Sequence, residues 1–144
     1  MTKSTNNQII PDAGEVITSY YKAANSGDWN TWLSLMDDNT IVDEYLTGFA
    51  KGVETLRILT EEVAKGYSKW VVHLKHKVVE GNEVCTGWTL EAMTSAGIPI
   101  SVNGASYFRV ENGKIAFWTN FHDTVPTQPD TGFRAFRARN GLNY

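Results

Sequence analysis

The chain has 144 residues, a length that predicts a single domain whose core needs neither disulfides nor metal ions. Its 42% hydrophobic and 12% aromatic content excludes a disordered chain, and a formal net charge of −3 gives no indication of a nucleic-acid-binding surface. The single cysteine, Cys85, cannot form an intramolecular disulfide. Because we find no signal-peptide pattern and no apolar stretch of membrane length, we expect a cytoplasmic protein with no membrane partner.

Three helices are predicted in the first half of the chain. Pro11 and Asp12 open the first helix, and a helical repeat of apolar residues follows at Ala13, Val16, Ile17, Tyr20 and Ala24. Asp28 caps a second helix. After a strand over residues 40–45, a third helix runs from about residue 53 to Gly66.

The second half of the chain is predicted to form four long strands, over residues 70–79, 83–94, 98–110 and 114–123. Helices followed by antiparallel strands indicate an α+β fold, in which the helices cover one face of a curved sheet. Such a sheet leaves a hollow that suits a small molecule. We expect one domain over residues 11–126, a loose N-terminus over 1–10 and an irregular tail over 127–144.

Two segments of the sequence resemble a known superfamily. Its SnoaL-like polyketide cyclases, ketosteroid isomerases and limonene epoxide hydrolases open with segments similar to YYKAANSGDWNTWLSLMDDNTIVDEY. Their closing strands are similar to GNEVCTGWTLEAMTSAGIPISVNGASYFRVENGKIAFWTNFHD. The resemblance implies the cone of the nuclear transport factor 2-like, or cystatin-like, fold: three N-terminal helices over a curved, mostly antiparallel sheet. This fold hosts enzymes and non-catalytic binders, so it does not name an activity.

Within this superfamily the resemblance argues against an epoxide hydrolase. Those enzymes carry an arginine and two aspartates where this chain has Trp88, Leu90 and Asn120. A tryptophan and a leucine cannot act as proton donor or base.

The resemblance to ketosteroid isomerases is closer. Asp43 falls at their carboxylate base and Tyr20 at their hydroxyl donor, whereas Ser106 stands where they have a carboxylic acid. His73 corresponds to the pocket histidine of related dehydratases.

Strand alternation gives a second, independent estimate of the pocket. A hairpin with an even loop at Gly81-Asn82 pairs His73 with Leu90 and turns both inward, whereas an odd loop or a bulge would turn His73 outward. Alternation also places Asp123 on the outer face. The expected catalytic residues are Asp43, Tyr20, His73 and Asn120. The expected ligand-binding residues are Tyr45, Trp88, Leu90, Ser106, Trp118 and His122.

Two functions are compatible with this pocket. The first is a cofactor-independent general acid–base enzyme (an isomerase, dehydratase or cyclase) acting on a hydrophobic polyketide-, terpenoid- or steroid-like molecule. In it Asp43 moves a proton, and Tyr20, with His73 or Asn120, donates to the oxygen that gains charge. The second is a non-catalytic ligand-binding or protein-interaction module.

The remaining expectations concern metals and partners. No metal site is expected, because His73 and His76 point to opposite sides of a strand and no cysteine–histidine cluster is present. We expect a homodimer through an outer sheet face that carries Trp70, Phe117 and Phe121.

Overall fold

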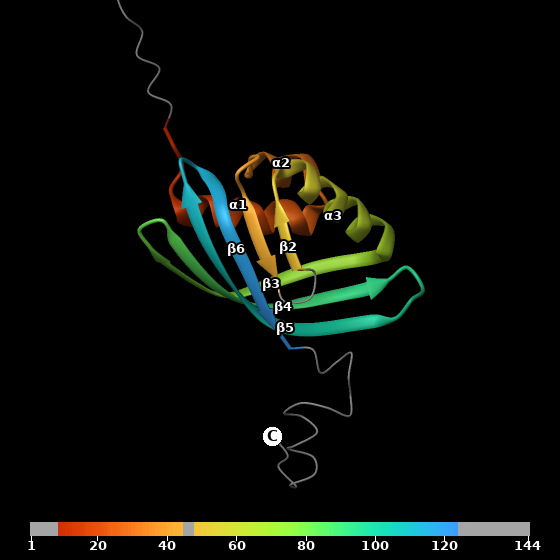
Figure 1. Ribbon diagram of the computed structural model, residues 1–144. Coiled ribbons are helices and arrows are strands. Elements are labelled where there is room, and N and C mark those ends of the chain that lie inside the picture. Colours follow the sequence, from red (N-terminus) through yellow and green to blue (C-terminus); the bar gives the residue numbers. More distant parts are fainter. Residues whose placement is uncertain (1–8, 45–47, 124–144) are drawn as a thin grey trace, which may run out of the picture.

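Three helices lie across the concave face of an open, strongly curved sheet in the computed structural model, which describes residues 9–44 and 48–123 (Figure 1). The helices are α1 (Ala13–Ser26), α2 (Trp29–Ser34) and α3 (Val53–Gly66). The strands are β1 (Ile41–Glu44), β2 (Gly48–Lys51), β3 (Tyr67–Glu80), β4 (Glu83–Thr94), β5 (Pro99–Glu111) and β6 (Lys114–His122). This arrangement confirms the predicted α+β cone.

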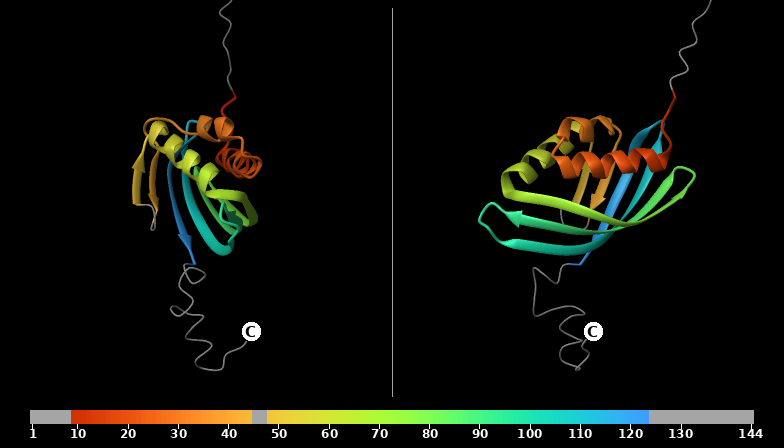
Figure 2. Two further views of the ribbon diagram at one scale, coloured as in Figure 1. Left: turned by 90° about the vertical axis from the view of Figure 1, so that its right-hand side faces the viewer. Right: turned by 180° about the vertical axis from the view of Figure 1, so that it is seen from behind.

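The sheet has the order β2-β1-β6-β5-β4-β3, and its neighbours are antiparallel except for the parallel pair β1 and β6. Figure 2 shows the long strands β3, β4 and β5 sweeping beneath the helices. The sequence analysis missed β2, a strand of four residues at the sheet edge. The four long strands begin and end within three residues of their predicted positions.

The helix ends follow from their local sequence. Asp12 Oδ1 accepts a hydrogen bond from the backbone N–H of Glu15 at 2.8 Å, and the Glu15 carboxylate accepts from the Asp12 N–H at 3.1 Å, which makes a reciprocal cap for α1. Gly27 ends α1 in the left-handed conformation, with φ 69°. Asp28 caps α2 by accepting from the Thr31 N–H at 3.0 Å.

The core lies between α1 and the inner face of the sheet. Val16 and Ile17 on α1 pack with Phe108 on β5 and Ile115 on β6, and all four side chains are fully buried. Burial of side chains of this size stabilises the fold by about 1.5–3 kcal/mol each. None of the helices in the described ranges is long and apolar enough to cross a bilayer.

The predicted limits of the domain, residues 11 and 126, are not tested by the structure. Most of the predicted N-terminal segment and the whole of the predicted tail over 127–144 lie outside the described residues. Ile9 and Ile10, which are described, are exposed.

Candidate functional site

A cavity of about 450 Å³ lies between the helices and the inner face of the sheet. Its wall is rich in aromatic side chains: Tyr20, Tyr21, Trp29, Trp32, Tyr67, Trp70, Trp88 and Trp118. Seven other residues with polar side chains also reach it: Glu44, Thr60, Glu62, Ser106, Asn120, His122 and Asp123. An apolar cavity of this size with a few polar groups is typical of a small-molecule site.

Tyr20 lies at the centre of the aromatic wall. Its ring centroid is 5.5 Å from that of Trp32 and 5.7 Å from that of Trp118. Burial is the largest cause of a strong rise in the pKa of Tyr20, with the neighbouring Tyr21 adding to it. The hydroxyl therefore stays protonated and can act as a hydrogen-bond donor.

Glu44 and His122 form a pair at the cavity wall. The imidazole Nε2 of His122 lies 3.2 Å from Glu44 Oε1, and the two side chains are only 14% and 15% exposed. The parallel pairing of β1 with β6 places Val42 opposite Trp118 on the inner face. Glu44 and His122 share that face, because residues two apart on a strand point the same way.

A chain of hydrogen bonds orders the floor of the cavity. Trp88 Nε1 donates to Ser106 Oγ at 2.8 Å, and Ser106 Oγ donates to Asn120 Oδ1 at 2.6 Å. With its oxygen engaged, the Asn120 side chain has its amide N–H groups left as donors. Trp88 can lie flat over β5 because its cross-strand neighbour is Gly104, where a Cβ would be 2.3 Å from the indole ring.

Two tryptophans of the wall have unused donors. The Nε1 atoms of Trp32 and Trp118 are buried and have no hydrogen-bond partner. The Trp32 indole lies beside the Tyr20 hydroxyl and lowers the pKa of Tyr20 against the larger effect of burial, although the two groups do not meet the geometry of a full hydrogen bond. A buried N–H without a partner costs about 1–3 kcal/mol.

Comparison with known proteins decides the family. The SnoaL-like domain matches residues 17–118, which is more than half of the chain. The chain belongs to the SnoaL-like domain family. The superfamily predicted from the sequence is thereby confirmed. No match was found among curated proteins.

Solved structures share the fold of this SnoaL-like chain. A nuclear transport factor 2-like protein of unknown function from Burkholderia pseudomallei has a TM-score of 0.75 at 13% identity, over 83% of this chain and 96% of its own. A candidate polyketide cyclase from Pseudomonas putida has a TM-score of 0.73 at 21% identity, over 85% of this chain and 99% of its own. TerC, co-crystallized with polyporic acid, has a TM-score of 0.73 at 17% identity, over 81% of this chain and 95% of its own. At these identities the likeness shows the fold alone.

The SnoaL-like cavity contains most of the predicted residues. Tyr20, Trp88, Leu90, Ser106, Trp118, Asn120 and His122 all line it. Tyr45 lies outside the described residues.

The prediction that Asp43 faces the cavity is wrong. Asp43 is exposed on the outer face of β1, opposite Phe49 of β2. The inner face of this strand is set by Val42, which pairs with Trp118, so the carboxylate that reaches the cavity is that of Glu44. The sequence analysis missed Glu44 because the resemblance to ketosteroid isomerases placed the carboxylate base at Asp43.

The prediction that His73 faces the cavity is also wrong. The register of β3 on β4 shifts between Leu74 and His76, which leaves Lys75 as an extra residue. The bulge pairs His73 with Thr89 and turns it outward, where its Nε2 lies 3.3 Å from the carboxylate of Glu91. Both side chains of this pair are about half exposed.

Two further placements differ from expectation. Trp70, predicted on the outer face, lines the cavity and stacks edge-on against Tyr67. Asp123, also predicted outside, follows the end of β6 and lines the cavity as well. Alternation fails for Asp123 because it lies beyond the last residue of the strand.

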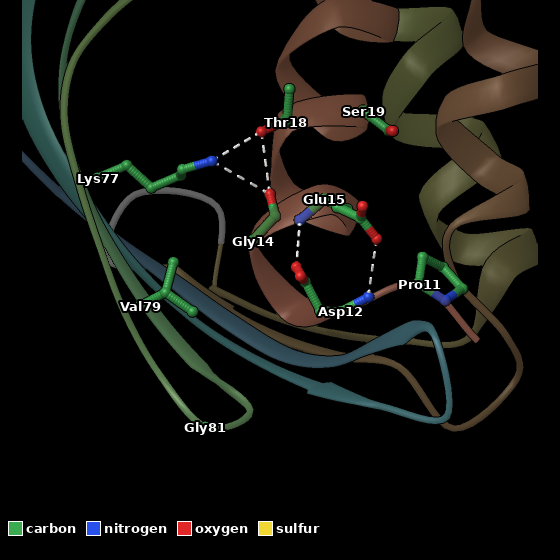
Figure 3. A pocket seen from close by; sticks show the side chains of 9 residues that line it. All are labelled: Pro11, Asp12, Gly14, Glu15, Thr18, Ser19, Lys77, Val79 and Gly81. Carbon is green, nitrogen blue, oxygen red and sulfur yellow. Dashed lines mark hydrogen bonds between the residues drawn. The ribbon is translucent and has the colours of Figure 1, made fainter. Parts of the chain in front are cut away.

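A second hollow of about 810 Å³ is open to solvent and lies between the start of α1 and the β3–β4 hairpin (Figure 3). Lys77 Nζ donates to Thr18 Oγ1 at 2.8 Å and to the Gly14 carbonyl at 3.3 Å, and Asp12 and Glu15 are bonded in the cap of α1. These polar groups are satisfied by the protein itself, so the aromatic cavity is the better candidate. In the described part of the chain, no three histidine, cysteine or acidic side chains gather closely enough to hold a metal ion.

Proposed function

We propose that this chain is a general acid–base enzyme that moves a proton on a small, largely apolar substrate bound in the aromatic cavity. The observation that supports this most strongly is the Glu44–His122 pair, which is mostly buried and stands among apolar rings. Such a pair of ionisable groups in an apolar cavity is a common arrangement at catalytic sites.

In this proposal His122 is the group that takes and returns the proton. Its Nε2 faces Glu44, so the carboxylate can hold the neutral ring in the tautomer that has N–H at Nε2. The lone pair of Nδ1 is then the base. When Nδ1 takes a proton, the adjacent carboxylate stabilises the imidazolium that forms, as in other carboxylate–histidine pairs.

Tyr20 and Asn120 supply donors for the oxygen that gains charge. Loss of a proton from a carbon next to a carbonyl moves an electron pair onto the carbonyl oxygen. The Tyr20 hydroxyl, which burial keeps protonated, can donate to that oxygen. The Asn120 amide is oriented by Ser106 and can add a second hydrogen bond. His122 then returns the proton to another atom, so the step needs only side-chain groups.

The substrate class follows from the wall of the cavity. The eight tyrosines and tryptophans of the wall favour a flat, unsaturated molecule. The names of solved neighbours, which include candidate polyketide cyclases and TerC with polyporic acid, favour a polyketide-like carbonyl compound. Isomerisation, dehydration and cyclisation of such compounds all begin with the same proton transfer.

The test is deuterium exchange at the carbon acids of β-tetralone and indanone, followed by NMR in heavy water against a buffer blank. We expect the wild-type protein to accelerate exchange, and Glu44→Gln to lower the rate at least about 10-fold. Glu91→Gln is the matched control, because Glu91 pairs with His73 in the same way on the outer face. It should leave the rate unchanged.

Three other outcomes would count against the proposal. Equal rates in the two glutamine variants would remove the Glu44–His122 pair from the reaction. If exchange is no faster than in the blank but the wild type binds polyporic acid, the protein is a non-catalytic ligand-binding module and not an enzyme. Absence of both exchange and binding would exclude the cavity as a site for this class of molecule.

We also propose that the chain forms a homodimer through the outer face of the sheet. Phe49 on β2 and Phe121 on β6 are 67% and 63% exposed. Two large aromatic side chains exposed on one face are typical of a surface that a second copy covers. Trp70, which the sequence analysis assigned to this face, belongs to the cavity and has no part in the interface.

A further inference from the structure

The indole of Trp88 lies across the sheet and covers part of the cavity floor. Trp88 pairs with Gly104 on β5, and a Cβ at Gly104 would be 2.3, 2.4 and 2.7 Å from three atoms of the six-membered ring. The ring therefore occupies the space where a side chain at position 104 would otherwise stand. Its Nε1 donates to Ser106 Oγ at 2.8 Å, which holds the indole in this position. One face of the indole is thus turned to the sheet and the other to the cavity, which Trp88 lines.

No other aromatic ring covers this inner face. Each of the other tyrosines and tryptophans of the wall contacts at least one aromatic ring: Tyr20, Tyr21, Trp29, Trp32, Tyr67, Trp70 and Trp118. Among the described residues, Trp88 alone in this wall has no aromatic neighbour in contact with it. Its face is therefore available to a ring that the chain itself does not supply.

Two polar residues of the proposed reaction stand beside this indole. The pairing of β5 with β6 joins Ser106 to Asn120 and Gly104 to His122. The part of the indole bonded to Ser106 thus lies next to Asn120, and the part over Gly104 lies next to His122. An indole N–H can only donate, so Ser106 accepts from it and gives its own hydrogen bond to Asn120 Oδ1, at 2.6 Å. Trp88 therefore fixes both a flat surface and the direction of the Asn120 amide.

We propose that Trp88 determines the specificity of the cavity by selecting substrates with a planar, unsaturated ring, which stacks on the inner face of its indole. Stacked aromatic rings are stabilised beyond the burial of their area. A saturated ring has hydrogens above and below its mean plane, which keep it from stacking distance. Because Asn120 and His122 lie beside the indole, the planar ring and the reacting carbonyl belong to one fused or directly joined unit of the substrate.

The experiment compares β-tetralone with trans-2-decalone, which has the same fused carbon skeleton and the same ketone but no planar ring. Affinities of both probes for wild type and Trp88→Leu are measured by equilibrium dialysis. Leucine keeps the wall apolar without offering a flat face. We expect the affinity ratio of β-tetralone to trans-2-decalone to be roughly 3- to 10-fold higher in wild type than in Trp88→Leu.

Trp29→Leu is the matched control. Trp29 lines the same cavity from α2, where its ring packs edge-on against Trp32. The same substitution there also removes an indole and widens the cavity, so it lowers both affinities alike and leaves their ratio at the wild-type value. If Trp88→Leu leaves the ratio unchanged, or if Trp29→Leu lowers it as much, Trp88 does not determine the specificity.

A second measurement uses the wild-type protein alone. Protons held over the face of an indole are shifted upfield in NMR spectra, and they show nuclear Overhauser contacts to its ring protons. We expect both effects for the aromatic protons of bound β-tetralone, with the contacts made to the ring of Trp88. Contacts to other rings without Trp88, or no binding of β-tetralone, would overturn the proposal.

The inference rests on the proposed function only in taking the aromatic cavity as the substrate site. Both measurements report binding, whereas deuterium exchange reports turnover. A protein that stacks β-tetralone on Trp88 but catalyses no exchange would retain the stacking surface and refute the enzyme. A protein that catalyses exchange, with the same affinity ratio in Trp88→Leu as in wild type, would retain the enzyme and refute the stacking surface.

Discussion

Substitution of Gly104 by alanine should displace Trp88 and destabilise the protein. A Cβ at position 104 would lie 2.3, 2.4 and 2.7 Å from three atoms of the Trp88 ring. Ordinary van der Waals contact begins at 3.4 Å, so the ring must move by about 1 Å. A movement of that size breaks the 2.8 Å hydrogen bond from Trp88 Nε1 to Ser106. Overpacking costs about 1–3 kcal/mol and the lost bond about 1 kcal/mol, so we expect a loss of about 2–4 kcal/mol.

The free energy of unfolding, measured with urea, tests this. Gly87→Ala is the matched control, because Gly87 lies on the adjacent strand next to Trp88. There a Cβ would meet only His76, at 3.3 Å, and that exposed side chain can move. Gly87→Ala should change the stability by less than about 1 kcal/mol.

A double-mutant cycle identifies the cause of the loss. Phenylalanine lacks the outer ring atoms that a Cβ at position 104 would meet. In a Trp88→Phe background, Gly104→Ala should therefore cost less than about 1 kcal/mol. If Gly104→Ala costs the same in both backgrounds, contact with the Trp88 ring is not the reason for the glycine.

Three further predictions concern pH, oligomeric state and specificity. Because burial raises the pKa of Tyr20, the protonated Tyr20 side chain stabilises the fold fully below about pH 10, and this contribution falls by about 1.4 kcal/mol per pH unit above it. Tyr20→Phe should therefore make the loss of unfolding free energy at alkaline pH, measured by urea titration, less steep. An unchanged slope would contradict this. Phe121→Asp should turn a dimer at tens of micromolar (order of magnitude) into a monomer by light scattering, whereas a wild-type monomer would refute the interface. Limonene-type epoxides should stay unhydrolysed, since Trp88, Leu90 and Asn120 replace the hydrolase residues; diol formation would refute this.

The helix ends could be predicted from the sequence because their signals are local. Asp12, Gly27 and Asp28 act on backbone groups within four residues of themselves, so no knowledge of the tertiary structure is needed. The closing hairpins were predictable for the same reason. The aromatic character of the cavity followed from the family resemblance, which supplied the inner faces of β4 and β6.

The face of a short strand was not predictable. In the segment Ile41-Val42-Asp43-Glu44, alternation fits equally well with either carboxylate inside. The parallel pairing of Val42 with Trp118 turns Glu44, rather than Asp43, toward the cavity. This pairing joins residues that are far apart in the chain. No local pattern could reveal it.

The outward turn of His73 left a visible signal. The regular register places Lys75 and Lys77 on the cavity face, and lysine is rarely buried there without a partner. The structure resolves the conflict with a bulge at Lys75 and with hydrogen bonds from Lys77 to α1. The sequence analysis placed His73 inward and left a bulge as the alternative; the two lysines in an otherwise inward pattern were the local sign that favoured the alternative, although they did not give its position.

The proposed proton transfer is tested most directly by comparing deuterium exchange of β-tetralone in two histidine variants. His122→Asn removes the histidine of the buried pair, and His73→Asn removes the histidine of the exposed pair, each next to a glutamate at a similar distance. The account predicts that His122→Asn lowers the exchange rate by roughly 10²- to 10⁴-fold, while His73→Asn leaves it at the wild-type value. Equal rates in the two variants would contradict it.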